Sequence, residues 1–430
     1  MLANTPLTSS AMTAHSAQPH WTPPTQINTN SAMGLPDLTT ATTETSQKEW
    51  THDACITMTL IDESTSVAFW LERTQEVKSV KLEKSVSIPN IIAFSSDMME
   101  SIQQNDSSKL NFGKDAMKYL NDASMSIVYP SVLLSGTSHR KHDMYTILNN
   151  KYLQLNSSSH KVEMKILLSS LFTYLFELAS QTYVTEVGEI ARKSSKKKSK
   201  RRQGMSFVIP SFASCAYRNI LKDAVAHANI PLRNVFGHGI AAVTGALFHR
   251  TPSMQKTSFA MEISKLSKND VIVLFIHASL FHLDVALVQC EGAVNAREIS
   301  KASVFQRIST LASSGNFLHG NESKSELVEC LVGHIKNVLA RGGADVILAD
   351  GSQDIIKEAL KTSTLKTPLF TTNETDASYG GCLLSAAELD SSKEYLQAED
   401  GDWYISYLVS THCSLYSYII CSSYLLETMC

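Results

Sequence analysis

Alternation of apolar and polar residues starts at residue 55, and this pattern predicts that ordered structure begins there. Between Cys55 and Trp70 the alternation runs on both sides of a polar turn at Asp62–Ser64, which predicts two strands joined by that turn. The same pattern predicts a third strand over Val77–Leu82. The apolar run Ser87–Phe94 predicts a further short, buried strand.

Helical periodicity is strongest over residues 163–192 and weaker over residues 113–121. In the longer segment apolar residues recur at spacings of three and four, at Met164, Leu167, Leu168, Leu171, Phe172, Leu175 and Leu178. These spacings place the apolar side chains on one face of a helix. The segment 163–192 therefore gives the strongest helix prediction of the chain.

Beyond this helix the predicted strands and helices follow a repeating order. Met205–Ile209 predicts a strand, which is followed by helices at Ser214–Asn229, with Ser211 or Ser214 as its N-cap, and at Val235–Phe248. The second half predicts strands at Val271–Phe275, Asp284–Gln289 and Asp345–Ala349, and helices at Ser325–Ala340, Gln353–Lys361 and Tyr379–Leu389. Strand pairs near the start of each half, each followed by a strand and two helices, predict a duplicated α/β architecture.

Composition supports a large folded region flanked by atypical ends. The 430 residues are 43% hydrophobic with a formal net charge of -3, which allows a sizeable core and excludes a globally basic nucleic-acid binder. Residues 1–48 are rich in Thr, Ser, Pro, Ala and Asn, so we expect a disordered head. We divide the remainder into a first lobe (49–250, with a basic loop at 192–204), a second lobe (251–392) and a divergent tail (393–430).

Cysteine spacing and the chain ends bear on the cellular compartment. The eight cysteines form no CxxC pair, which argues against a structural zinc site and a disulfide scaffold. The first thirty residues lack the apolar core of a secretory signal, so we expect a cytosolic protein, with nuclear import as an alternative. The tail segment Tyr404–Leu426 is long enough to span a bilayer, but its Ser and Tyr content and His412 disfavour a membrane span.

Four segments in a fixed order resemble the nucleotide-binding domain of the Hsp70 family. The longest is FVIPSFASCAYRNILKDAVAHANIPLRNVFGHGIAAVTGAL (207–247); the others are SIPNIIAF with FGKDAMKYL, VILADGSQDIIKEAL (346–360) and NETDASYGGCLLSAAEL (373–389). Residues 308–320 are most similar to the atypical, ribosome-associated type exemplified by heat shock 70 kDa protein 14. The resemblance implies an actin-like, ribonuclease-H-like duplicated ATPase fold of two lobes. It further implies that the outer part of the second lobe, around residues 291–330, is shortened.

The resemblance also implies a site for ATP or ADP with Mg²⁺ between the lobes, and the residues expected there depart from the family pattern. The first phosphate turn, Thr59–Glu63, has Ile61 in place of a glycine, and the second, Ile276–Phe281, has no glycine. A branched side chain at such a turn blocks the close approach of backbone to phosphate. The position of the family's catalytic lysine falls near Val132 in this chain. The family's glutamate in the motif NEPT is replaced here by His238. The residues left to face a nucleotide are Ser279, Asp350, Gly351 and Ser352.

These departures predict a pseudo-ATPase rather than an enzyme. Within the resemblance, we expect a degenerate co-chaperone or scaffold that assists protein folding through partners, such as a J-domain protein at the ribosome, with no required cofactor. The tail does not resemble the family's substrate-binding domain, so an ATP-gated peptide clamp is not expected. The alternative is a weakly ATP-binding chaperone ATPase.

Two further features carry candidate chemistry. The run Arg192–Arg202 contains eight basic residues and predicts either a solvated loop or a contact with RNA, the ribosome or the nuclear-import machinery, through Lys196, Lys197, Lys198, Lys200, Arg201 and Arg202. His277 and His282 flank the second phosphate turn and suggest a metal pair. Because the sequence shows no third ligand beside them, we expect a structural or surface role for both and no metal site.

Overall fold

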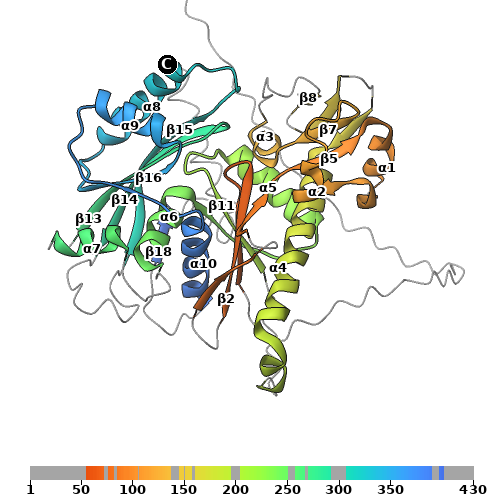
Figure 1. The fold of residues 1–430 in the computed structure, drawn as a ribbon, viewed down its shortest axis with the longest axis horizontal. Coiled ribbons are helices and arrows are strands. Elements are labelled where there is room, and N and C mark those ends of the chain that lie inside the picture. The colour runs from red at the N-terminus through yellow and green to blue at the C-terminus, as the bar shows by residue number, and fades with distance from the viewer. Residues whose placement is uncertain are drawn as a thin grey trace, which may run out of the picture. The chain divides into compact units, whose positions relative to one another are not determined.

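The computed structural model describes residues 55–71, 76–81, 85–104, 106–136, 145–149, 151–156, 160–194, 204–249, 257–266, 270–291, 307–389 and 397–400. All of them belong to one compact unit, Trp50–Cys430. The predicted head 1–48 and the tail segment Tyr404–Leu426 lie outside the described residues. The described chain has a mixed α/β fold built on two large sheets (Figure 1).

The first sheet combines an antiparallel meander with two parallel strands. Its meander is β1 (Cys55–Thr59), β2 (Ser64–Leu71) and β3 (Glu76–Ser79), which confirms the hairpin predicted at Asp62–Ser64. On the other side of β1, β11 (Gly204–Ile209) and β12 (Leu232–Gly237) run parallel to it, giving the order β12-β11-β1-β2-β3. The short strand β4 (Ser87–Pro89) also pairs with β2.

The second sheet repeats this arrangement. Its meander is β13 (Asp270–Ala278), β14 (His282–Glu291) and β15 (Arg307–Phe317). On the other side of β13, β16 (Val346–Gly351) and β17 (Leu369–Thr371) run parallel to it. The predicted pairing of Val271–Phe275 with Asp284–Gln289 is confirmed. Four residues of the predicted tail form β18 (Gln397–Asp400), which pairs with β15.

The helices follow the strands in the same order in both halves. In each half the meander is followed by the order helix, strand, helix, strand, helix. The helices of the first half are α4 (Met164–Ser194), α5 (Cys215–His227) and α6 (His238–Phe248). Those of the second half are α8 (Lys324–Leu339), α9 (Gln353–Thr362) and α10 (Asp376–Leu389). The apolar stripe predicted for α4 is buried in the core, except that Leu178 is only partly buried against it. The hydroxyl of Ser214 accepts a hydrogen bond from the Tyr217 amide and caps α5. The alternative cap, Ser211, instead accepts the Gly239 amide of α6. The helix α7 (Ser258–Lys265) precedes the second sheet.

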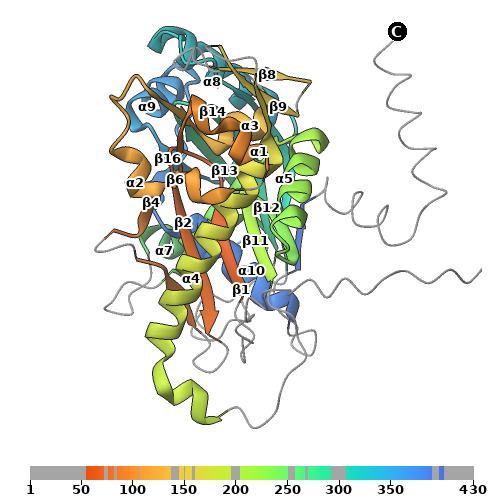
Figure 2. The ribbon, with the colours of Figure 1, turned by 90° about the vertical axis from the view of Figure 1, so that its right-hand side faces the viewer.

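Each sheet is covered on both faces. Figures 1 and 2 show α4 and α5 on one face of the first sheet and α10 on the other. Alternation along β11 sets these faces, because Phe207 packs against Phe172 of α4 while its neighbour Val208 lies beside Gly381 of α10. In the second sheet α8 and α9 cover one face, and α6 packs on the other, where Gly239 lies against Ala286. We call the face of the first sheet that contacts α10, and the face of the second sheet that contacts α6, the inner faces of the two sheets.

The helices α6 and α10 pack against each other with almost no room between their backbones. A Cβ atom added to Gly245 of α6 would lie 1.9 Å from the Asp376 carbonyl oxygen, and one added to Gly380 of α10 would lie 1.9 Å from the Ala241 carbonyl oxygen. The small residues predicted for both helices are thus explained by a close crossing. The helix predicted over Val235–Phe248 is wrong at its start, because Val235 to Gly237 complete β12 by pairing with β11.

Between β3 and α4 the first half contains an additional region of small sheets and short helices. It comprises β5 (Ile92–Ser95), β6 (Asn111–Phe112), β7 (Met125–Val128), β8 (Tyr145–Leu148), β9 (Tyr152–Leu155), β10 (Lys161–Glu163), α1 (Met99–Gln103), α2 (Gly113–Met117) and α3 (Pro130–Ser135), with two 3-10 turns. The second half has no counterpart between β15 and α8 among the described residues, where Leu318–Ser323 joins them directly. The described part of 291–330 consists of the last residue of β14, then β15 and the first half of α8.

Two predictions in this region are wrong. Ser87–Phe94 forms two strands rather than one, because the chain leaves β2 after Pro89 and joins β7 from Ile92. The amide of Asn90 bonds instead to the Glu63 carbonyl, at the point where the chain changes partner. The helix predicted over 113–121 is limited to Gly113–Met117, and turns follow it.

Candidate functional site

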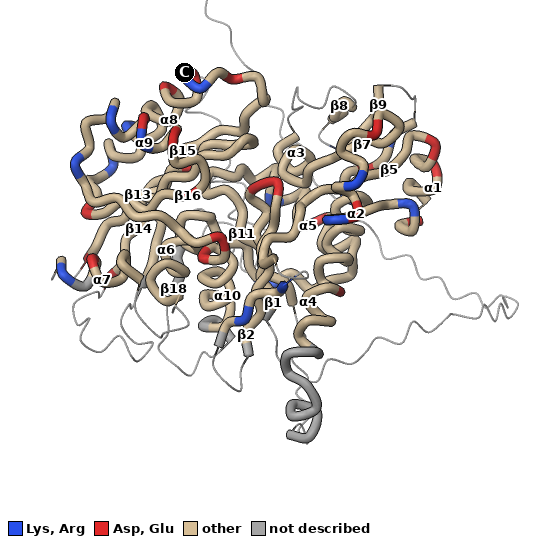
Figure 3. The backbone as a smooth tube through the Cα atoms, viewed as in Figure 1, with Lys and Arg blue, Asp and Glu red and all other residues tan. Residues whose placement is uncertain are grey.

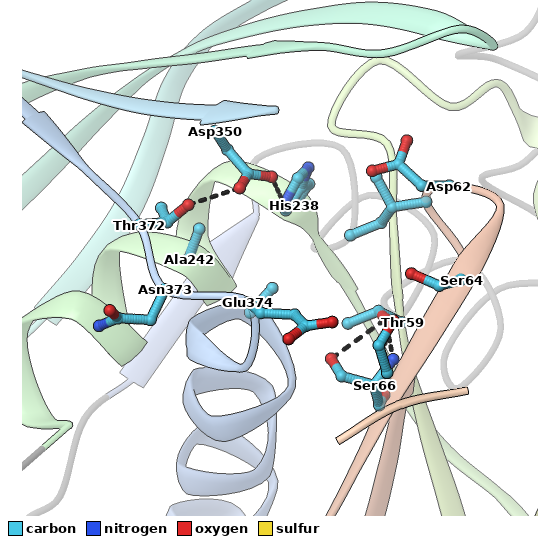
Figure 4. Close-up of a pocket in the computed structure, with 13 residues that line it drawn as sticks. Thr59, Asp62, Ser64, Ser66, His238, Ala242, Asp350, Thr372, Asn373 and Glu374 are labelled. Carbon is cyan, nitrogen blue, oxygen red and sulfur yellow. Dashed lines mark hydrogen bonds and ion pairs between the residues drawn. The ribbon is translucent and has the colours of Figure 1, made fainter. Parts of the chain in front are cut away.

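A small cavity lies where the β1–β2 turn faces α6, the end of β16 and the start of α10 (Figure 4). Its volume is about 110 Å³, below the roughly 300–1,000 Å³ of typical cofactor pockets. It is lined by Thr59, Ile61, Asp62, Ser64, Ser66, Ser87, His238, Ala242, Asp350, Thr372, Asn373, Glu374 and Ala377. These lining residues include Asp62, Asp350 and Glu374 but no Lys or Arg, and the β1–β2 turn beside the cavity is acidic (Figure 3).

Beside this cavity, titratable side chains form a row on the inner face of the second sheet. His277 of β13 is the direct partner of Asp350 in β16 and of Asp284 in β14. Directly paired residues of neighbouring strands present their side chains on the same face. His282 precedes Asp284 by two residues and shares that face as well. The register of three strands therefore gathers two imidazoles and two carboxyl groups at one end of the sheet.

His277 is the centre of this row. Its side chain is fully buried, with Nδ1 2.8 Å from Asp350 Oδ2 and Nε2 3.2 Å from Asp62 Oδ1. Burial alone would lower the pKa of His277, but the attraction of Asp62 and hydrogen bonds to both carboxylates raise it well above its usual value. His277 is therefore a charged imidazolium at neutral pH, held between two carboxylates.

Both carboxylates in contact with His277 are ionised. Burial opposes ionisation of Asp62, yet the charge and the hydrogen bond of His277 lower the pKa of Asp62 to about 2. Burial also opposes ionisation of Asp350, whereas hydrogen bonds from His238 and His277 hold its pKa well below the usual range. Thr372 donates a short hydrogen bond from its hydroxyl to the other oxygen of Asp350.

A third imidazole reaches the same place from α6. His238 is the first residue of that helix and is buried, with Nε2 3.2 Å from Asp350 Oδ2. Its ring centroid lies 4.8 Å from that of His277. The other nitrogen of His238, Nδ1, is buried and has no hydrogen-bond partner among the described residues.

His282 and Asp284 also carry buried atoms without partners. The ring of His282 stacks on His277 with centroids 4.7 Å apart, and its Nε2 has no hydrogen-bond partner. Burial and the nearby charge of His277 lower the pKa of His282 well below its usual value, so this imidazole is neutral. Asp284 Oδ2 accepts the Ser211 amide at 2.7 Å, while Oδ1 has no partner, and burial raises the pKa of this carboxyl. Ser211 also accepts the Gly239 amide at 2.9 Å.

We call His238, His277, His282, Asp62, Asp284 and Asp350 the histidine–carboxylate cluster. One candidate ligand atom from each of its histidines lies within 4.8 Å of the other two. The structure thus brings a third histidine, His238, beside His277 and His282, where none was expected from the sequence. A signal was present in the sequence: the Hsp70 resemblance assigns His238 and His277 to the same expected nucleotide site.

The four residues expected to face a nucleotide lie together at this end of the second sheet, but only Asp350 belongs to the cluster. Gly351 has a φ of +79°, and a Cβ there would lie 2.2 Å from the Ala278 carbonyl oxygen. That same oxygen accepts the Ser352 amide at 2.8 Å. The Ser279 amide closes the β13–β14 turn on the His282 carbonyl at 3.1 Å. Ser279, Gly351 and Ser352 thus make backbone contacts that fix the turns at the ends of β13 and β16.

The other sequence predictions fall outside the cluster. Val132, aligned with the family's catalytic lysine, is buried in α3. Ile61 is buried at the cavity wall. The basic run Arg192–Arg202 begins in the last turn of α4, and its side chains from Lys196 to Arg202 lie outside the described residues.

Comparison with known proteins gives no assignment: no family model matches the sequence, and no curated protein matches it. Within the part of the chain that the structure describes, no helix is long and apolar enough to cross a membrane.

Proposed function

We propose that this chain is a degenerate Hsp70-type protein with an actin-like duplicated ATPase fold, and that it acts as a pseudo-ATPase scaffold. Two features support the fold assignment. The meander followed by helix, strand, helix, strand, helix occurs twice in the same order, with two parallel strands on the same side of each meander. The helix that ends each repeat, α6 or α10, packs on the sheet of the other repeat.

The observation that carries the functional proposal is the position of His277 between Asp62 and Asp350. In an ATPase of the proposed class, turns from the two repeats hold the phosphates of one nucleotide through backbone N–H groups. Here the β1–β2 turn and the end of the β13–β16 pair are joined by hydrogen bonds through His277. The cluster thus links the two sheets directly, as a bound nucleotide would link them in an ATPase.

Charge at the cavity supports the same conclusion. Lysine, arginine and Mg²⁺ neutralise the phosphates in phosphoryl-transfer sites. This cavity has Asp62, Asp350 and Glu374 on its wall and no Lys or Arg among its described lining residues. Two of these carboxylates, Asp62 and Asp350, are held ionised by histidines. A triphosphate entering the cavity would meet like charges, which opposes binding.

A protein that keeps this fold without a nucleotide cycle acts through the surfaces it presents. The resemblance to ribosome-associated members of the family supports a role as a co-chaperone that binds a partner, with a J-domain protein at the ribosome as the expected case. The basic run at Lys196–Arg202 is the segment whose charge suits contact with ribosomal RNA.

Calorimetric titration of the full-length chain with Mg-ATP and Mg-ADP tests the proposal. We expect no heat of binding and no rise in the unfolding temperature at millimolar nucleotide. A ligand at a hundred times its Kd would stabilise the native state by about 2.7 kcal/mol, which is readily measured. Micromolar binding that Ser352→Asp abolishes, and that Ser325→Asp on the exposed first turn of α8 leaves intact, would establish the weakly ATP-binding chaperone ATPase instead.

A further inference from the structure

We propose that His238, His277 and His282 bind one divalent transition-metal ion, with Zn²⁺ as the expected metal. The inference concerns the same histidine–carboxylate cluster as the proposed function, but it rests on the arrangement of the three imidazoles, and metal binding and nucleotide binding are tested by separate titrations. Three histidines from α6, β13 and β14 form a ligand set typical of zinc sites that keep one open coordination position.

The distances suit such an ion after a small contraction. One candidate ligand atom from each histidine lies within 4.8 Å of the others. Zn–N bonds of about 2.0–2.1 Å in a tetrahedron place the nitrogens about 3.4 Å apart. The imidazoles therefore need to close by at most about 1.4 Å. All three lie beside one another already, with His277 between the other two rings.

The unpartnered nitrogens point independently to a ligand. His238 Nδ1 and His282 Nε2 are buried, and neither forms a hydrogen bond within the described part of the chain. Buried polar groups normally have a partner, and an unmet one is costly. A metal ion bound by these two nitrogens would satisfy both at once. His277 holds a carboxylate on each nitrogen, so it would exchange one of them for the metal and keep the other.

The surrounding charges favour a cation. Because only a neutral imidazole binds a metal, binding through one nitrogen of His277 displaces any proton on that nitrogen. The carboxyl groups of Asp62 and Asp350 lie within hydrogen-bond distance of His277, where they can balance the charge of a divalent ion and the positive N-terminal end of α6 at His238. Asp350 contacts both His238 and His277, which is the carboxylate–histidine–metal arrangement that orients ligands in known sites.

The ligand set also selects the metal. Imidazoles suit zinc, copper, nickel and iron, whereas Mg²⁺ and Ca²⁺ take oxygen ligands. His238, Asp62 and Asp350 all line the cavity, so the ion can enter from there. A cavity water or the carboxylate of Asp62 can complete the coordination.

The experiment uses the full-length chain, stripped of metal with a chelator and dialysed. Titration with Zn²⁺, with elemental analysis after gel filtration, should give one tightly bound equivalent. Co²⁺ in place of Zn²⁺ should give the visible bands of a tetrahedral ion without a thiolate-to-cobalt charge-transfer band. That second condition excludes binding by any of the eight cysteines.

Variants then assign the ligands. His238→Asn and His282→Asn should each weaken Zn²⁺ binding by more than about a hundredfold, since loss of an outer partner alone costs about 10–100-fold. Asp350 positions the histidines rather than binding the metal, so Asp350→Asn should weaken Zn²⁺ binding by only about 10–100-fold. The matched control is His334→Asn: this half-buried histidine of α8 bonds to Ser314, Asn316 and Cys330, outside the cluster, and its loss should leave the affinity unchanged.

Several results would overturn the proposal. One is that the protein binds less than one equivalent of Zn²⁺, and another is that the Co²⁺ spectrum shows a thiolate band. A third is that His282→Asn keeps full Zn²⁺ affinity while His334→Asn loses it. If a cluster variant fails to fold in the presence of chelator, the wild-type Co²⁺ spectrum decides alone, because it reports nitrogen against sulfur ligation without any substitution.

Discussion

His277 Nε2 lies 3.2 Å from Asp62 Oδ1, although the two residues are 215 positions apart and belong to different sheets. The contact joins the β1–β2 turn of the first sheet to β13 of the second. On its other side the same imidazole bonds to Asp350 at the end of β16. A single buried side chain thus links both halves of the repeated fold.

Replacing Asp62 should weaken this link. Removing one partner of a fully buried ion pair costs about 3–5 kcal/mol. The Asp62 side chain is 35% exposed, so water screens part of its interaction, and we expect Asp62→Asn to lower the free energy of unfolding by about 1–2 kcal/mol. Urea unfolding of the chelator-treated protein measures this change. Glu63→Gln, at the exposed neighbour in the same turn, is the control and should change the value by less than about 0.5 kcal/mol. Equal effects of the two substitutions would contradict the link.

The stability of the metal-free protein should depend on pH on both sides of a maximum. Asp62 and Asp350 have lowered pKa values, so their contribution is present above the ordinary value of 3.8 and is lost as the pH falls, through about 2 for Asp62. His277 has a raised pKa, so its contribution is complete below 6.5 and is lost as the pH rises through the raised value. Urea unfolding at a series of pH values should therefore show a decline above about pH 6.5. His277→Gln should flatten that alkaline decline, and an unchanged slope would show that another group causes it.

The crossing of α6 and α10 should not tolerate a single added methyl group. We expect Gly245→Ala and Gly380→Ala each to destabilise the protein by about 2 kcal/mol or more, because a Cβ at either position meets backbone atoms at 1.9 Å. Gly333→Ala in α8 is the matched control, since nothing lies within 4 Å of its Cβ position. That change should stabilise the helix by up to about 1 kcal/mol. Thermal unfolding of the three variants gives the comparison, and a destabilised Gly333→Ala would remove the packing explanation.

The basic run should carry a salt-sensitive interaction if the chain works at the ribosome. Replacing Lys196, Lys197 and Lys198 together by alanine should reduce co-sedimentation with purified ribosomes and flatten its dependence on salt. The charge-matched control replaces Lys357, Lys361 and Lys366, which are exposed on α9 and after it. Equal loss in both variants would mean that net charge alone drives the association.

Most elements of the fold could be predicted from the sequence because their patterns are local. The spacing of apolar residues in 163–192 specifies α4, and alternation on both sides of Asp62–Ser64 specifies the first hairpin. The errors occur where partners far along the chain decide the structure. Val235 looks helical beside Gly239 and Ala241, but pairing with β11 holds it in a strand.

The candidate site shows the same division. His277, His282 and Asp350 could be named from the sequence, because the family resemblance places the two histidines beside the second phosphate turn and Asp350 in the adenosine motif. His238 could not be added to them by spacing, because α6 brings it to the second sheet through tertiary packing. The ion pair of His277 with Asp62 likewise depends on how two sheets meet, which no local pattern encodes.

Amide hydrogen exchange with and without Mg-ATP tests the central claim most directly. The claim is that His277, held by Asp62 and Asp350, closes the site without a nucleotide. Exchange at Leu60–Ser64, Asp270–Ala278 and Val346–Ser352 should therefore be the same with and without millimolar Mg-ATP. In Asp62→Asn the β1–β2 turn should exchange faster in both conditions. Protection of these three segments on adding Mg-ATP to the wild-type protein would contradict the account.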